Sequence, residues 1–209
     1  MRYRAPVEAS MRVFSYVVAA DSGFAPNPFH GVCTLACCKP TIRRTASAGD
    51  LVVGMSRRCE RVVYAMRVAR VLDFEGYWAD AAAASKRPDR AAASARLRRG
   101  DNIYRPLGDG EFEQLPSGHS QQDGSRHEGH CRRDLGGRHV LVADDFCYFG
   151  GAGPPVPIEL GFLKTGRGHR CHFTAEQLRL VERWFEEIPR GVLGAPGRWP
   201  PGDDSWREA

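Results

Sequence analysis

The sequence predicts one α+β domain, built as a small mixed β-barrel with flanking helices. Several short runs of β-branched and aromatic residues are separated by turn residues, which is typical of strands. Only a few stretches have helical periodicity, and they do not alternate regularly with the strands as they would in a parallel α/β fold. We expect the domain to span residues 11–190, between a flexible extension at 1–10 and a flexible proline- and glycine-rich tail at 191–209.

Four strands are expected in the first third of the chain. The segment between the third and fourth strands, residues 56–60, reads as a hairpin loop. The fourth strand alternates only partly, as expected for a strand with one face in water. The predicted strands cover residues 12–20, 32–37, 50–55 and 61–72.

The remaining elements are fewer and more widely spaced. Phe74, Tyr77 and Trp78 form an apolar stripe that predicts a short helix over residues 73–84. Residues 116–137 contain few apolar side chains and read as a long mobile loop, and 139–143 as a strand. Thr174 and Gln177 form a capping box that predicts a helix over 174–188.

The composition is that of a globular domain with a sizeable core, since 42% of its 209 residues are hydrophobic and 26% are charged. The net charge of +5 permits a nucleic-acid partner, but a compositional bias toward arginine explains it equally well. Neither a signal peptide nor a membrane-spanning run is recognisable. We therefore expect a cytoplasmic protein with reduced thiols and no membrane partner.

A basic segment follows the second predicted strand. Lys39, Arg43 and Arg44 surround a bend fixed by Pro40. Arginine forks match phosphate oxygens and lysine adds a point charge, so this segment is a candidate phosphate site. Three unrelated surface cations on a turn are the competing interpretation.

Two further segments are candidate ligand sites. Asn27 lies between two prolines in the loop that begins at Asp21, and an amide held in one direction could read a base edge. Asp21 and Asn27 could instead cap turns with their side chains. Arg167, His169 and Arg170 lie in a glycine-rich segment that could bind a second anion, or form an ordinary turn before the last helix.

Catalytic candidates are weaker in the sequence. His119 stands between hydroxyl residues and could act as acid or base, and Cys38 could pair with His169 as a nucleophile. The seven cysteines form no CxxC pair, and their spacing with the histidines does not favour zinc. We therefore expect no metal and no other cofactor.

The order of motifs resembles the nucleotide modification associated domain 2 family over residues 11–188. The resemblance rests on the runs FSYVVAADSGFAPNPFHGVCTLACCKPTIRRTASAGDLVVG, VVYAMRVARVLDFEGYW, RRGDNIYRP, SGHS, HVLVADDFCYFG and GRGHR. It implies a role in bacterial and phage systems that make or handle modified bases. The residues that it implies as lining the site are Asp21, Asn27, Lys39, Pro40, Arg43, Arg44 and the GRGH run from Gly166 to His169.

A shorter stretch is similar to PUA-like domains, including the ASCH and EVE groups. It comprises the strand at Gly49–Gly54 and the following strand VVYAMRVARVLDF, which leads into the short helix predicted over residues 73–84. This similarity implies a pseudo-barrel that holds a nucleobase. The insertions at residues 79–99 and 116–137 depart from that pattern.

These observations predict a protein that binds a nucleotide, or a modified base in nucleic acid, through a cationic pocket. The alternative is an enzyme acting on nucleotides or DNA bases, with Cys38, His119 or His169 supplying the chemistry beside the same cations. A protein-interaction subunit would instead expose a large apolar patch on the last helix.

Overall fold

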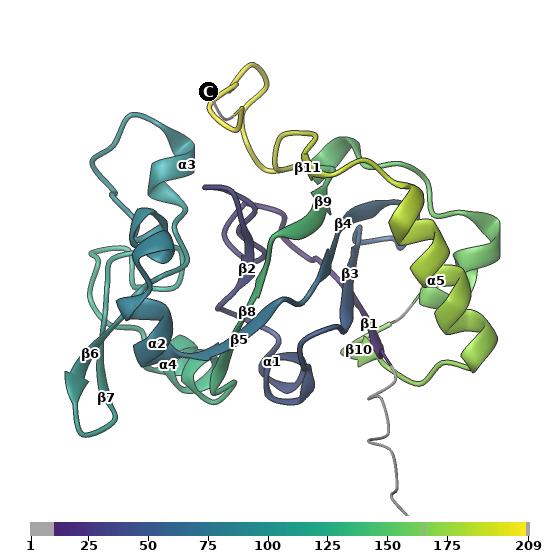
Figure 1. Cartoon of the computed structure of the whole chain (residues 1–209). Helices are drawn as coiled ribbons and strands as arrows, with labels where there is room; N and C mark the ends of the chain where they lie inside the picture. The colour runs from purple at the N-terminus through teal and green to yellow at the C-terminus, as the bar shows by residue number, and fades with distance from the viewer. Residues whose placement is uncertain (1–10, 165, 208–209) are drawn as a thin grey trace, which may run out of the picture.

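The computed structural model describes residues 11–164 and 166–207, and its strands form two packed sheets and a separate hairpin (Figure 1). The large sheet has the order β10-β1-β3-β4-β9-β11 and the second sheet the order β2-β8-β5. The strands of the large sheet are β1 (Val13–Val17), β3 (Leu51–Met55), β4 (Val62–Arg67), β9 (Asp145–Tyr148), β10 (His169–Arg170) and β11 (Gly191–Val192). The others are β2 (Cys33–Leu35), β5 (Arg70–Asp73), β8 (His139–Ala143) and the hairpin strands β6 (Tyr104–Gly108) and β7 (Glu111–Gln114).

The helices cover the outer faces of the two sheets. Helix α5 lies on one side of the molecule, and α2, α4 and the β6–β7 hairpin lie on the other (Figure 1). Among the described residues, none of the helices combines the length and apolarity needed to cross a membrane. The helices are α1 (Pro40–Thr45), α2 (Phe74–Ala79), α3 (Ala95–Arg98), α4 (Glu128–Leu135) and α5 (Ala175–Glu187), with 3-10 turns η1 (Ala81–Lys86), η2 (Gly150–Ala152) and η3 (Ile158–Leu163).

The α+β class is confirmed, but none of the sheets described here closes into a barrel. The expected strand over 61–72 is two strands that belong to different sheets, β4 and β5. The switch falls between Val68, whose N–H donates to the carbonyl of Asp50 directly before β3, and Ala69, whose N–H donates to the carbonyl of Val142 in the second sheet. This corner passes the chain from one layer to the next, so the sheets stack instead of closing.

The large sheet separates two apolar clusters. On β3, Leu51, Val53 and Met55 face the cluster that contains Val181 and Phe185 of α5. Val52, between them, faces the opposite cluster, as the period of two in a strand requires. The helix predicted over residues 174–188 is confirmed as α5, and the Thr174–Gln177 capping box is present at its start.

The opposite face of the large sheet packs on the second sheet and α1. Tyr16 and Tyr64 meet there, with their hydroxyl oxygens 2.9 Å apart, against Leu35 and Ile42. A third cluster lies beyond the second sheet and joins α2, β6 and α4. The candidate site described below draws residues from β1 and β10 of the large sheet, from the turn between β2 and α1, and from α4.

Three segments differ from their predicted structure. The basic bend is the short helix α1, which Pro40 begins because its fixed φ suits a first helical position. The segment predicted as a long loop contains α4. The predicted tail includes β11 and contributes Trp199, which stacks on Phe29 with ring centroids 5.5 Å apart.

Candidate functional site

The turn from β2 into α1 places Cys38 and Lys39 in left-handed backbone conformations, with φ of 61° and 40°. Such a conformation costs a non-glycine residue of order 1–3 kcal/mol, so the surroundings must hold it. The Cys38 N–H donates to Asp134 Oδ1 at 2.8 Å, and the Cys38 carbonyl accepts from Arg43 Nε at 2.7 Å. The turn therefore presents the Cys38 side chain in a fixed direction.

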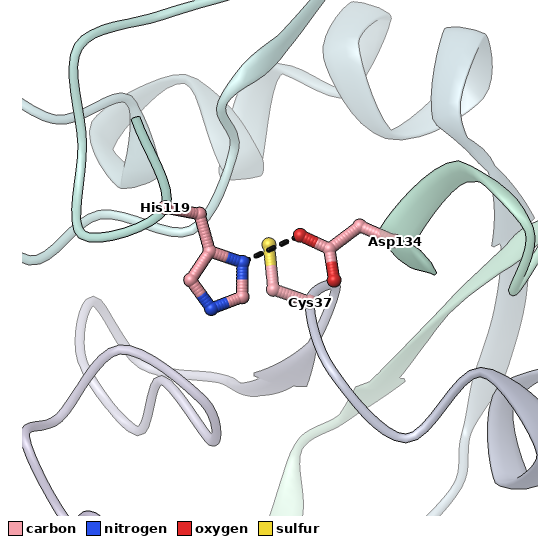
Figure 2. A group of neighbouring side chains, drawn as sticks. All are labelled: Cys37, His119 and Asp134. Atoms are coloured by element: carbon pink, nitrogen blue, oxygen red, sulfur yellow. Dashed lines mark hydrogen bonds and ion pairs between the residues drawn. The ribbon is translucent and has the colours of Figure 1, made fainter. Parts of the chain in front are cut away.

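A chain of hydrogen bonds leads from the protein interior to the Cys38 thiol. Tyr104 donates its hydroxyl to Asp134 Oδ2 at 2.9 Å, and the same oxygen lies 2.6 Å from His119 Nδ1 (Figure 2). His119 Nε2 lies 3.6 Å from Cys38 Sγ. Exposure increases along this chain, from Asp134, which is fully buried, through His119, which is 8% exposed, to the half-buried Cys38.

These contacts shift the ionisation of His119 and Asp134. Burial opposes a charge on His119, but its hydrogen bonds to Asp134 and Cys38 outweigh burial and raise the pKa of the ring to about 9. Burial likewise disfavours the Asp134 anion, but the hydrogen bonds from His119, Cys38 and Tyr104 lower the pKa of Asp134 below its ordinary value. At neutral pH the two groups form a buried ion pair that orients the imidazole.

The loop that carries His119 is fixed by polar contacts rather than by regular structure. Gln114, at the end of β7, donates to the His119 carbonyl at 3.2 Å and accepts from the His127 N–H at 2.8 Å. The hydroxyls on either side of His119 shape the turn, since the Ser117 N–H donates to Ser120 Oγ at 2.9 Å. These hydroxyls therefore have a structural role.

Cys37, His119 and Asp134 place three possible metal-ligand atoms within 4.8 Å of one another (Figure 2). Asp134 already accepts bonds from Cys38, Tyr104 and His119, and burial raises the pKa of the Cys37 thiol well above its usual value. A metal ion would have to displace the bond between His119 and Asp134. The donor set therefore fits an oriented histidine better than a metal centre.

Cys38 lies where two cavities adjoin. The larger, which we call the central cavity, measures about 770 Å³ and is lined by Tyr16, Lys39, Arg167 and His169 as well as Cys38. The smaller, the histidine cavity, measures about 400 Å³ and shares Cys38 with the central cavity. A volume of 770 Å³ lies within the range of small-molecule sites.

Two flanking cavities extend this pair in both directions. One, of about 240 Å³, shares Arg99 and Gly118 with the histidine cavity, and the other, of about 670 Å³, shares His169 with the central cavity. None of the described residues that line the four cavities carries a carboxylate. The cations lining them are Lys39, Arg90, Arg98, Arg99, Arg133, Lys164, Arg167, Arg170 and Arg198.

The structure brings together three of the predicted ligand-binding residues. Lys39, Arg167 and His169 line the central cavity, although they come from the basic segment and from the distant glycine-rich segment. Arg170 lines the flanking cavity beyond His169. Arg133, which the sequence interpretation did not select, also lines the central cavity from α4.

The other predicted ligand-binding residues lie outside the central cavity. Arg43 is fully buried and donates to the carbonyls of Cys38, His139 and Asp134. Arg44 donates to the Gly136 carbonyl on the surface. Both arginines therefore stabilise the turn and α4 by donating to backbone carbonyls of the protein itself.

Asp21 and Asn27 have similar internal roles. Asp21 accepts from the Tyr148 hydroxyl and from the Gly197 N–H. Asn27 donates to the Arg99 carbonyl at 2.9 Å, and its side-chain oxygen accepts from Lys86 Nζ at 2.7 Å. These bonds run to distant segments of the protein, and neither residue lines the central cavity.

The thiol of Cys38 contacts His119, whereas the sequence suggested His169 as its partner. His169 lines the same central cavity, and burial, with Lys39 and His172 nearby, lowers the pKa of its ring. Asp134 was missed because its segment was read as a loop. Gly136 and Gly137 directly after Leu135 are a helix-end signal that could have revealed α4.

Comparison with known proteins gives one match. Residues 10–202 match the family model described as nucleotide modification associated domain 2. No curated protein and no solved structure matches the chain. Because the family model covers most of the sequence, the chain belongs to the nucleotide modification associated domain 2 family.

Proposed function

We propose that this protein binds a nucleotide, or a modified base within a nucleic-acid strand, in the central cavity. The observation that carries the proposal is the chain of four adjoining cavities lined by nine lysine and arginine side chains and by no carboxylate among the described residues. A single phosphate needs one or two such cations, so a chain of them suits several phosphates along a strand. The family name supports the same class of ligand.

The central cavity also offers an environment suited to a base. Besides its cations it is lined by Tyr16, Val18, Ala25 and Ile42, which are apolar or aromatic. Lys39 Nζ lies 4.4 Å from the centroid of the Tyr16 ring, so one cation and one aromatic face share this wall. We therefore expect the base to enter the central cavity, with the phosphates following the arginines outward.

Binding of a labelled single-stranded oligonucleotide, followed by anisotropy at several salt concentrations, tests this function. The double variant Lys39→Ala/Arg167→Ala should bind about tenfold more weakly. The slope of its log binding constant against log salt concentration should also become shallower, by the equivalent of roughly one phosphate contact or more. The matched control removes the two exposed cations Arg57 and Arg58, which line none of the four cavities. Equal losses in both variants, or affinity that does not change with salt, would contradict the proposal.

A second candidate function is favoured by a different observation, the hydrogen-bonded Cys38 at the floor of the same cavity. An enzyme with a thiol nucleophile would use the cations to place its substrate and Cys38 to react with it.

A further inference from the structure

We propose that Cys38 is a catalytic nucleophile, with His119 as its acid and base and Asp134 as a positioning residue, and that it cleaves acyl bonds on a nucleotide or nucleobase. The proposal rests on the proposed function for the placing of the substrate, and on the geometry of the three side chains for the chemistry. A nucleophile, a base within hydrogen-bond reach and a third group that orients the base are the recurring parts of such sites.

Cys38 differs from the structural cysteines of this chain in its access. Cys33, Cys37 and Cys147 are fully buried, and burial raises the pKa of each of their thiols. Cys38 is half-buried and lines two cavities. A thiol that only filled space in a core would need neither an opening nor a histidine nitrogen beside it.

The direction of His119 is the second line of evidence. Its Nδ1 is occupied by Asp134, so its Nε2 is the atom left to face the cavity, and Cys38 Sγ is its partner there. The Phe24 ring packs against the imidazole with a centroid separation of 4.8 Å. A buried ion pair that served stability alone would not require this outward-facing nitrogen to meet a thiol.

The strained turn between β2 and α1 is the third line of evidence. Two consecutive non-glycine residues with positive φ hold the thiol at the strand-to-helix junction, and Asp134 binds both the backbone of this turn and the imidazole. One carboxylate therefore sets the position of the nucleophile and of its base together. Backbone strain of this kind is concentrated at functional sites.

The reaction can be written with all atoms accounted for. With its proton already on His119 Nε2, as the charged pair of His119 and Asp134 requires, the Cys38 sulfur forms a bond to the acyl carbon. The bond from that carbon to the nucleotide nitrogen or oxygen then breaks, and His119 returns the proton to the leaving group. Water attacks the thioester and gives one proton to His119. The carbon–sulfur bond then breaks with its electron pair on sulfur, so that the acid is released and the proton again lies on His119 beside Cys38.

The charge that develops on the acyl oxygen needs a donor in the same cavity. The backbone N–H of Cys38 is committed to Asp134, so it cannot serve. Lys39 follows Cys38 directly and lines the central cavity beside it. Its ammonium group is the donor that the structure offers for this oxygen.

The first experiment measures the reactivity of each thiol in the wild-type protein. Iodoacetamide at pH 7.5, followed by peptide mass spectrometry, should modify Cys38 at least tenfold faster than Cys171, which is also half-buried but lies in another cavity. His119→Gln should reduce the Cys38 rate to that of Cys171, and Cys37→Ala should leave it unchanged. Equal wild-type rates at Cys38 and Cys171 would overturn the proposal without any variant having to fold.

The second experiment identifies the reaction. N4-acetyl-deoxycytidine monophosphate and N6-acetyl-deoxyadenosine monophosphate are the probes, and acid-quenched protein should carry an acetyl group on Cys38 while acetate is released. Cys38→Ser should bind the probes and release no acetate. Acetate release at the wild-type rate by Cys38→Ser, or none by the wild type, would overturn acyl cleavage.

The two proposals fail in different ways. If wild-type protein and Cys38→Ser both bind the oligonucleotide in a salt-dependent manner but neither Cys38 alkylation nor acetate release stands out, the nucleophile is wrong and the binding function remains. If neither protein binds while Cys38 still alkylates selectively, the binding function is wrong.

Discussion

The two sides of Cys38 are built from similar residues and behave differently. On the inner side, Arg43 and Asp134 are fully buried, and the hydrogen bonds described above join both residues to other groups of the protein. On the outer side, Lys39 and Arg167 line an open cavity. Lys39 and Arg43 are four residues apart in one basic segment, so local sequence alone does not separate a fully buried cation from one that lines a cavity.

Burial explains the difference. A buried guanidinium must bind acceptors on every side, and Arg43 meets three carbonyls, at 2.7 Å, 2.6 Å and 2.5 Å. Lys39 is half-buried, with its ammonium over the Tyr16 ring, and burial lowers the pKa of its side chain. The cation on the inner side thus holds the turn in place, whereas the cations on the outer side line the cavity.

Removal of Arg43 should have the largest effect on stability. Arg43→Ala should lower the free energy of unfolding by about 3–5 kcal/mol, because it leaves a cavity and three unpaired buried carbonyls. Arg44→Ala is the control and should cost less than about 1 kcal/mol, since Arg44 is exposed. Urea denaturation measures both, and similar costs for the two variants would remove the distinction between inner and outer cations.

A pair of glycines tests the packing on the two sides. A Cβ at Gly137 would lie 2.3 Å from Cζ of Arg43, whereas a Cβ at Gly166, on the outer side, would meet nothing within 4 Å. Gly137→Ala should therefore destabilise the fold by about 1–3 kcal/mol, and Gly166→Ala by less than about 0.5 kcal/mol. The midpoint of thermal unfolding is a sufficient measure, and an undisturbed midpoint for Gly137→Ala would show that Arg43 is less tightly enclosed than the structure indicates.

The pH dependence of stability tests the ion pair between His119 and Asp134. The folded pKa of His119, about 9, is higher than its ordinary value of 6.5. Its stabilising contribution is therefore full below pH 6.5 and is lost as the pH rises through 9. Over this pH range we expect the free energy of unfolding of the wild type to fall by about 1–2 kcal/mol. This fall should be absent in His119→Gln.

Urea denaturation at pH 6.5 and pH 9 measures this contribution. The difference between wild type and His119→Gln isolates it, because other groups that titrate in this range are present in both proteins. If the free energy of unfolding fell equally in both proteins between pH 6.5 and pH 9, His119 would not gain its proton affinity from Asp134.

Much of the fold was predictable because its signals are local. The strands at β1, β3 and β8 follow β-branched runs, and α5 follows a capping box and a stripe that includes Val181 and Phe185. The sequence predicted a barrel, and the open sheets found instead were not predictable, because the exchange from β4 to β5 depends on which distant strand each N–H meets. Helix α4 was missed because its apolar stripe is weak, although its glycine stop was visible.

The sequence by itself determined the class of fold, the family and the presence of two cationic segments, since these follow from composition, local pattern and motif order. Only the tertiary structure decided which cations line a cavity and which are buried, because that depends on segments such as 133–139, about 95 residues away from α1. It alone placed His119, rather than His169, beside Cys38. A hydrogen bond depends on atoms within a few ångströms, and no pattern along the chain encodes that distance.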